Sequence, residues 1–124
     1  MVRPISYPDA FVAACPTREV LDRISDKWVS LILVALADGS LGHRELLRRI
    51  DGVSQKMLTQ TLRQLERDGI VAYTKLDTVP SRSRYELTAL GTSLLPVLAA
   101  VKAWAEEHMV DVVAARGRFD EGSA

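Results

Sequence analysis

The hydrophobic positions between residues 54 and 68 recur with the period of an α-helix. Leu58, Leu62 and Leu65 stand at i, i+4 and i+7, so they form one apolar stripe. The opposite side carries five basic or polar residues and no acidic one: Lys56, Thr59, Gln60, Arg63 and Arg67. A groove lined with phosphates would select such a face. For this helix taken alone, a solvated face that happens to be basic is the simpler alternative.

The pattern ahead of this segment predicts three more helices. Thr17 is a candidate N-cap for a short helix that follows a proline-containing N-terminal arm. Residues 26–38 are apolar almost all round, which is typical of a central core helix with no solvent-facing side. Residues 43–50 predict a third helix, and residues 51–53 a glycine-containing turn before Ser54 caps the next helix. Helix, short turn and helix together indicate a helix-turn-helix.

The pattern after residue 69 predicts a β-hairpin and then a long helix. Residues 70–76 and 84–87 indicate two strands around a polar loop, so the order is that of a winged helix-turn-helix. Thr88 caps a helix that reaches about residue 116, with Gly91 and Pro96 weakening or kinking its beginning. The apolar residues of this helix cover more than one stripe. The surplus predicts contact with the same helix of a second copy, and coverage by the N-terminal arm of its own chain is the alternative.

The fold class expected is therefore mainly α with a small β-hairpin wing, in a single domain over residues 1–124. Residues 1–25 form an N-terminal dimerisation arm and helix, and residues 26–88 the winged helix-turn-helix core. Residues 89–116 form a C-terminal dimerisation helix, and residues 117–124 a tail. The fold is thus expected to dimerise through its N- and C-terminal helices.

Charge changes this picture by its distribution and not by its sum. The formal net charge is zero, yet residues 43–84 hold nine Lys or Arg and five Asp or Glu, between flanks that are acidic. A basic module of this kind suits the DNA backbone. The longest apolar run is about half of a membrane span and no signal peptide is visible, so no membrane partner is expected. A single cysteine excludes an intrachain disulfide and suits a reducing cytoplasm.

Many spaced residues between positions 13 and 105 match one known family in order. They are Cys15-Pro16, Asp26-Lys27-Trp28, Glu45-Leu46, Ile50, Ser54, Lys56, Leu58-Thr59, Leu62, Leu65-Glu66, Asp68-Gly69, Tyr85, Leu87-Thr88, Gly91, Leu94, Pro96 and Trp104. With these residues the chain resembles the HxlR family of bacterial winged-helix regulators, relatives of the MarR type. It departs from the family at His43-Arg44, where an aromatic residue is common, and at residues 83–86, where a Val-Glu-Tyr run is usual. The resemblance implies a homodimeric transcriptional regulator, usually a repressor, that binds a palindromic, inverted-repeat operator on double-stranded DNA.

The residues expected to contact DNA lie in the second helix of the helix-turn-helix (residues 54–68, the expected recognition helix), ahead of that helix, and in the hairpin. They are Arg44, Ser54, Gln55, Lys56, Thr59, Gln60, Arg63, Lys75, Arg82 and Arg84. Gln60 and Arg63 lie one turn into the recognition helix, where Gln can pair with adenine and Arg with guanine. Ser54 and Gln55 begin that helix, where the backbone amides favour a phosphate. The basic residues outside it are candidates for the backbone or the minor groove.

Cys15 is a candidate redox sensor. It directly precedes Pro16 at a predicted helix start, where the helix dipole can lower the pKa of a thiol, and Arg18 is a nearby cation. The structural alternative is that Cys15 only packs among apolar side chains, as a small hydrophobic residue. Several HxlR relatives sense oxidants, quinones or aldehydes through a cysteine at this position, and the resemblance implies the same here. A single cysteine leaves an intersubunit disulfide, a mixed disulfide or an alkylated thiol as outcomes.

Other functions are compatible with parts of the pattern. A phenolic or aldehyde effector could bind at the dimer interface, among Tyr7, Phe11, Trp28, Trp104 and Met109, with Cys15 not sensing. A winged helix can also serve protein–protein contact alone, although that role needs no acid-free face. An enzyme is not expected because no nucleophile–base pair or paired catalytic carboxylates are evident. The scattered His43, His108 and Cys15 predict no metal site, and no cofactor is expected.

Overall fold

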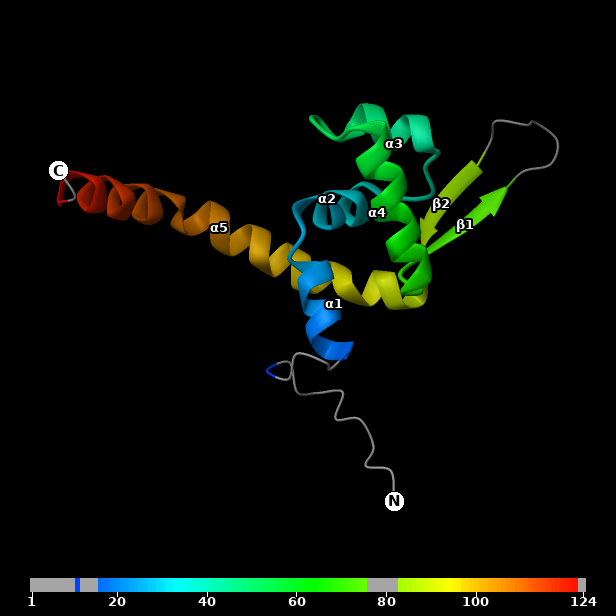
Figure 1. Cartoon of the computed structure of the whole chain (residues 1–124), viewed down its shortest axis with the longest axis horizontal. Helices are drawn as coiled ribbons and strands as arrows, with labels where there is room; N and C mark the ends of the chain where they lie inside the picture. Colours follow the sequence, from blue (N-terminus) through cyan, green and yellow to red (C-terminus); the bar gives the residue numbers. More distant parts are fainter. Residues whose placement is uncertain (1–10, 12–15, 76–82, 123–124) are drawn as a thin grey trace, which may run out of the picture. The chain divides into compact units, whose positions relative to one another are not determined.

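The computed structural model of the chain describes residues 11, 16–75 and 83–122. Its elements are α1 (Pro16–Ile24), α2 (Lys27–Ala35), α3 (His43–Arg49), α4 (Gln55–Arg67), β1 (Val71–Lys75), β2 (Ser83–Leu87) and α5 (Ala89–Gly122) (Figure 1). The expected class, mainly α with a β-hairpin, is confirmed. The described residues up to Thr92 belong to one compact unit and those from Ser93 onward to a second.

The core of the first unit is built by α2, α3 and α4. Leu58, Leu62 and Leu65 are all buried, so the apolar stripe predicted for residues 54–68 is confirmed. They pack with fully buried side chains of the two preceding helices, among them Ile32 of α2 and Leu46 of α3. Burying such a side chain stabilises a fold by about 1.5–3 kcal/mol. The stripe therefore decides which side of α4 turns inward.

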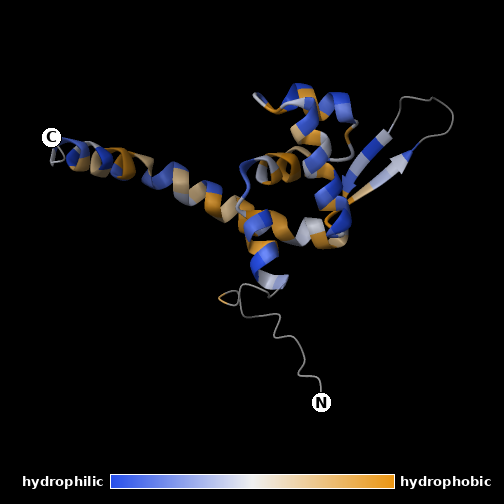
Figure 2. Ribbon diagram, in the orientation of Figure 1, coloured by the Kyte–Doolittle hydropathy of each residue, from blue (hydrophilic) through white to orange (hydrophobic). Residues whose placement is uncertain are grey.

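The prediction that α2 has no solvent-facing side is wrong. Leu31 and Val34 keep 46% and 44% of their surface exposed, although α2 is hydrophobic over most of its length (Figure 2). The helix is also shorter than predicted. It begins after Asp26, whose Oδ1 accepts a hydrogen bond from the Trp28 amide at 2.8 Å, and ends at Ala35. Neighbouring helices within the unit cover only one side of it, which a uniformly apolar pattern cannot reveal.

The turn between α3 and α4 has the features of a helix-turn-helix. Gly52 has a φ of +88°, in the left-handed region that favours glycine. The Ser54 hydroxyl then caps α4 by accepting a hydrogen bond from the Met57 amide at 3.0 Å. Gly69, with a φ of +75°, follows the C-terminal end of α4. The predicted cap, turn and helix end are confirmed.

The hairpin pairs β1 with β2 in antiparallel register. Tyr73 lies opposite Tyr85, and their ring centroids are 5.1 Å apart. A third segment, absent from the prediction, joins β2. The Leu41 amide donates to the Tyr85 carbonyl at 2.9 Å, and the Tyr85 amide donates to the Leu41 carbonyl at 2.8 Å. The strand that carries the return of the hairpin is therefore tied by its backbone to the segment just before α3. Most of the predicted loop lies outside the described residues.

Two predicted helix ends are wrong. Helix α1 starts at Pro16, a residue suited to the first helical position because it needs no amide donor, so Thr17 is inside the helix and does not cap it. Helix α5 continues to Gly122, so the tail expected over residues 117–124 is helical as far as the description reaches. Alanine and arginine, both good helix formers, dominate residues 114–118, and this propensity outweighs Gly117.

The start of α5 is held to the end of the preceding segment. The Thr88 hydroxyl accepts a hydrogen bond from the Gly91 amide at 3.1 Å, which confirms Thr88 as the cap. It also donates to the Gly69 carbonyl at 2.6 Å, with the Ile70 carbonyl at 3.1 Å. Gly91 is buried, and a Cβ there would lie 2.2 Å from the Ile70 carbonyl oxygen. The position requires glycine because two backbones meet.

The second unit is the remainder of α5. Within it, Trp104 stacks on His108 with centroids 4.8 Å apart, and Lys102 pairs with Glu106 at 2.6 Å, one helical turn on. Large apolar side chains on this part of the helix are exposed: Val97, Val101, Trp104, Met109, Val110, Val113 and Phe119. The dimerisation roles expected for residues 1–25 and 89–116 stay predictions.

Candidate nucleic-acid interface

The outer face of α4 is exposed along its whole length. Its residues are Lys56, Thr59, Gln60, Arg63 and Arg67, and each is exposed. Because the three leucines on the other side are buried, this face is directed away from the unit's own core. An open hollow of about 860 Å³ lies against it, and its described lining is Gln55, Lys56, Thr59, Gln60, Arg63 and Gln64. The face is thus accessible to a large partner.

One acidic side chain, Glu66, and the tyrosine pair of the hairpin, Tyr73 and Tyr85, lie near this face. Glu66 lies on the same helix beside Arg63, and the sequence reasoning did not weigh it. Burial raises the pKa of Tyr85, and the nearby Tyr73 and Glu66 raise it further, while Arg63 acts in the opposite direction. The influence of these two α4 residues on Tyr85, together with the contacts between β1 and α4, places the hairpin beside the C-terminal half of that helix.

Thr59 is bonded to His43, a residue that the sequence analysis named as a departure from the family and rejected as a metal ligand, but did not pair with Thr59. Its Oγ1 lies 2.9 Å from Nε2 of His43, the first residue of α3. The bond joins the two helices of the helix-turn-helix on their exposed side. Which atom donates depends on the histidine tautomer. The separation of sixteen residues left no local signal for this pair.

The remaining predicted contact residues fall into different surroundings. Arg44 in the first turn of α3, Gln55 at the start of α4 and Lys75 at the end of β1 are exposed. The Ser54 hydroxyl is already engaged in capping α4. Arg82 lies outside the described residues, and so does Cys15. Across the part of the chain that is described, no cluster of three or more His, Cys, Asp or Glu side chains could hold a metal ion.

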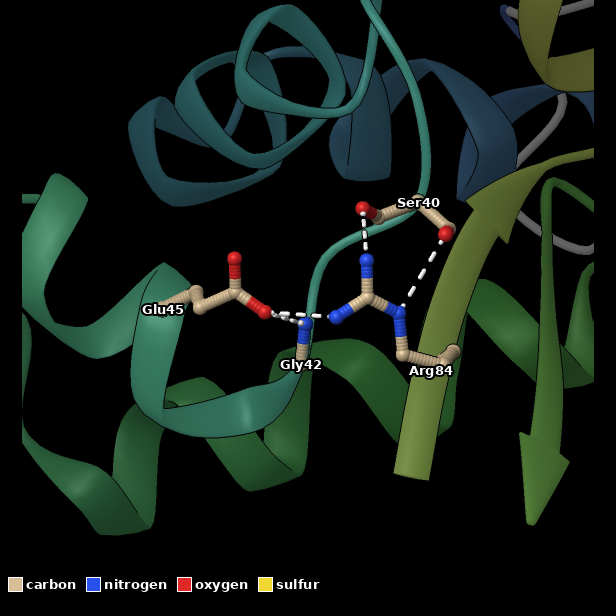
Figure 3. Close-up of polar contacts among 4 residues, drawn as sticks. All are labelled: Ser40, Gly42, Glu45 and Arg84. Carbon is tan, nitrogen blue, oxygen red and sulfur yellow. Dashed lines mark hydrogen bonds and ion pairs between the residues drawn. The ribbon is translucent and has the colours of Figure 1, made fainter. Parts of the chain in front are cut away.

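Arg84 of β2 donates three hydrogen bonds to the segment that leads into α3 and to its first turn (Figure 3). Its Nη1 donates to Glu45 Oε1 at 2.6 Å, its Nη2 to the Ser40 carbonyl at 2.7 Å, and its Nε to Ser40 Oγ at 3.3 Å. Glu45 Oε1 also accepts from the Gly42 amide at 3.1 Å. That amide bond, together with Arg84, keeps the pKa of Glu45 below its ordinary value, against the effect of desolvation. The predicted contact of Arg84 with DNA stays a prediction, and three of its donors already have partners in the chain.

An ion pair lies at the C-terminal end of α4. Arg23 of α1 donates through Nε to Asp68 Oδ2 at 2.8 Å, and the two side chains are 16% and 23% exposed. Asp68 is the C-cap of α4. The pair therefore joins α1 to the C-terminal end of α4.

A helix-turn-helix whose second helix exposes a basic face, followed by an antiparallel hairpin, defines the class of winged helix-turn-helix transcription regulators. The sequence profile of the HxlR-like helix-turn-helix family matches residues 23–112. The chain belongs to this family and is a transcriptional regulator of the helix-turn-helix type. Among its described helices, none is both long and apolar enough to cross a membrane.

Named relatives agree with this membership. The chain is 42% identical over 106 residues to the uncharacterized HTH-type transcriptional regulator YtfH of Escherichia coli (strain K12), covering 86% of this chain and 84% of that protein. The solved structure of the transcriptional regulator YtfH from Salmonella typhimurium is similar with a TM-score of 0.81 and 40% identity, over 88% of this chain and 97% of that one. The redox regulator HypR in its reduced form is similar with a TM-score of 0.72 and 35% identity, over 81% and 98% of the two chains.

Proposed function

We propose that this regulator binds an inverted-repeat operator as a homodimer and reads its bases with α4 of each copy. The observation that carries the proposal is the exposed face of α4. Three of its five residues are cations, namely Lys56, Arg63 and Arg67, and none of the five is acidic. Gln60 and Arg63 are the residues proposed to read base edges. Lys56 and Thr59 flank them, and Gln55, Arg44, Lys75 and Arg82 are proposed for the phosphate backbone or the minor groove.

Binding to the intergenic DNA beside the protein's own gene tests this proposal. Fluorescence anisotropy with a labelled duplex should show salt-dependent binding. Arg63→Ala should weaken it by about 1–3 kcal/mol and relax specificity at one base position. Arg118→Ala removes the same charge from an exposed site on α5 and is the matched control. Unchanged affinity in Arg63→Ala would show that the reading face was chosen wrongly.

Exposed apolar side chains support the homodimer. Val20 and Leu21 of α1 are exposed, as are Leu31 and Val34 of α2 and a series along α5. A second copy would remove this surface from water, and its recognition helix should then lie about 34 Å from the first, one turn of DNA away. Light scattering coupled to gel filtration should give twice 13.7 kDa. A monomer at micromolar concentration would contradict the proposal.

The proposed signal is a thiol-reactive compound that reacts with Cys15, in the reducing cytoplasm. Two supports are the position of this only cysteine, directly before the first residue of α1, and the similarity to a redox regulator. Oxidation by diamide would transfer two electrons and two protons from two thiols and form one intersubunit disulfide, whereas a quinone would alkylate the thiolate. Either product would change the dimer geometry and thereby the spacing of the two α4 helices.

The test compares operator binding before and after diamide or quinone treatment. Wild-type affinity should change, and Cys15→Ser should not respond. A Cys15→Ser protein that responds as the wild type does would favour a small phenolic or aldehyde effector bound without the thiol. Tryptophan fluorescence during titration with such compounds would then measure that binding directly.

A further inference from the structure

Arg84 joins β2 to a stretch of chain about forty residues earlier, which runs from Ser40 to the first turn of α3. It extends from β2, contacts both the carbonyl and the hydroxyl of Ser40, and forms an ion pair with Glu45 in the first turn of α3 (Figure 3). The two charged side chains are only 38% and 41% exposed. One guanidinium thus donates to three acceptors through three different nitrogens, which the fork of arginine allows and the single ammonium of lysine does not.

This junction lies where the hairpin leaves the helix-turn-helix. The backbone bridge between Leu41 and Tyr85 is isolated, so it ties β2 to the segment before α3 at one residue. At its base the hairpin is also attached to α4, because β1 contacts that helix and Val71 is buried. The bonds of Arg84 to Ser40 and Glu45, next to the bridge, attach β2 to the start of α3 through side chains as well. Helix α3 in turn packs on α4, so the attachment relates the hairpin to the recognition helix.

We infer that Arg84 is a positioning residue: it fixes the direction of the β1–β2 hairpin relative to α4 through Glu45 and Ser40, and does not bind a phosphate itself. The inference rests on the proposed binding of DNA. Glu45 serves both ends of the junction, since the oxygen that accepts from Arg84 also accepts from the Gly42 amide before α3. One carboxylate oxygen consequently contacts both the hairpin and the start of α3.

Substitution by lysine separates positioning from direct phosphate contact. Arg84→Lys keeps the positive charge but cannot reach all three acceptors, and Arg84→Gln removes the charge as well. If Arg84 bound a phosphate, lysine could replace it, because that contact needs a cation. If Arg84 positions the hairpin, lysine cannot replace it, because one ammonium does not reach the three acceptors. We expect both variants to bind the duplex that the wild type binds about tenfold more weakly, within the range of couplings among contacting residues.

A double-mutant cycle with Glu45→Gln tests the route of the effect. A glutamine oxygen can still accept from the Gly42 amide, so the start of α3 is kept while the charge that pairs with Arg84 is lost. If Arg84 acts through Glu45, the loss caused by Arg84→Gln should shrink at least threefold in the Glu45→Gln background. If Arg84 binds phosphate, that loss should be the same in both backgrounds.

Hydroxyl-radical footprinting of the same complexes supplies a readout that loss of stability alone would not move. Protection of the flanking DNA by the hairpin should disappear in Arg84→Lys, while protection at the major grooves read by α4 persists. Arg118→Gln, which removes a charge from an exposed site on α5 in the second unit and leaves the junction intact, is the control. An Arg84→Lys protein with wild-type affinity and footprint would overturn the inference alone. A wild-type protein that binds no duplex would overturn the proposed function and the inference with it.

Discussion

Replacing Gly91 with alanine should destabilise the first unit although alanine is the better helix former. The added Cβ would lie 2.2 Å from the Ile70 carbonyl oxygen and 3.2 Å from its carbonyl carbon. Carbon–oxygen contacts are normally no shorter than about 3.3 Å. Both atoms belong to the backbone, so no side-chain rotation relieves the overlap. The start of α5 must therefore move by about 1 Å away from Ile70, on that same contact distance.

The cost follows from what such a movement breaks. The Thr88 hydroxyl is within hydrogen-bond distance of the carbonyls of Gly69 and Ile70, and the Thr88 amide donates to the Ile70 carbonyl at 3.1 Å. Each lost hydrogen bond costs about 1 kcal/mol, and overpacking costs about 1–3 kcal/mol. The higher helix propensity of alanine offsets about 1 kcal/mol of this loss. We expect Gly91→Ala to lower the free energy of unfolding by about 2–3 kcal/mol.

Urea unfolding at matched protein concentration, followed by circular dichroism, measures this loss. With a typical slope for a small protein, the midpoint should fall by about 1–2 M. Gly117→Ala is the matched control on the same helix, because a Cβ there meets nothing within 4 Å. It should stabilise the helix by up to about 1 kcal/mol. A Gly91→Ala protein as stable as the wild type would refute the close backbone approach.

Three further experiments test the polar contacts that organise the first unit. In Glu45→Gln, the dependence of stability on acidic pH should become weaker. The pKa of Glu45 is lowered in the folded protein, chiefly by the Gly42 amide, so its contribution to stability is complete above the ordinary value of 4.5 and is lost as the pH falls through the folded pKa. Urea midpoints between about pH 6 and 3 would measure this difference. Parallel acid limbs in wild type and variant would contradict it. A double-mutant cycle with Arg23→Met and Asp68→Asn should give a coupling of about 1–2 kcal/mol in thermal unfolding, and additivity would show that the ion pair is not stabilising. Thr88→Val keeps the shape of the side chain but removes the cap of α5, and should lower the free energy of unfolding by about 1–2 kcal/mol in the same assay. Unchanged stability would show that the Thr88 hydroxyl does not cap the helix.

The amino-acid sequence by itself determined the elements and their order. The i, i+4, i+7 leucines gave α4 its inward side, and the residues left over on the outward side became the candidate interface. Gly52, Ser54 and Gly69 marked the turn and the limits of that helix because a positive φ or a side-chain cap is a local requirement. Properties of this kind depend on neighbours within a few positions, so the sequence predicted them here, although it misplaced the start of α1 and the ends of α2 and α5.

Contacts across long sequence separations were decided only by the tertiary structure. The bonds of Arg84 to Glu45 and of His43 to Thr59 join residues 39 and 16 positions apart, and the Leu41–Tyr85 bridge gave β2 a partner that the hairpin pattern did not predict. A cation reads the same in a sequence whether it meets a phosphate or a carboxylate of its own chain. The same holds for an apolar helix such as α2, whose pattern does not say which side is covered. Periodicity assigns a residue to a face, but only packing assigns that face a neighbour.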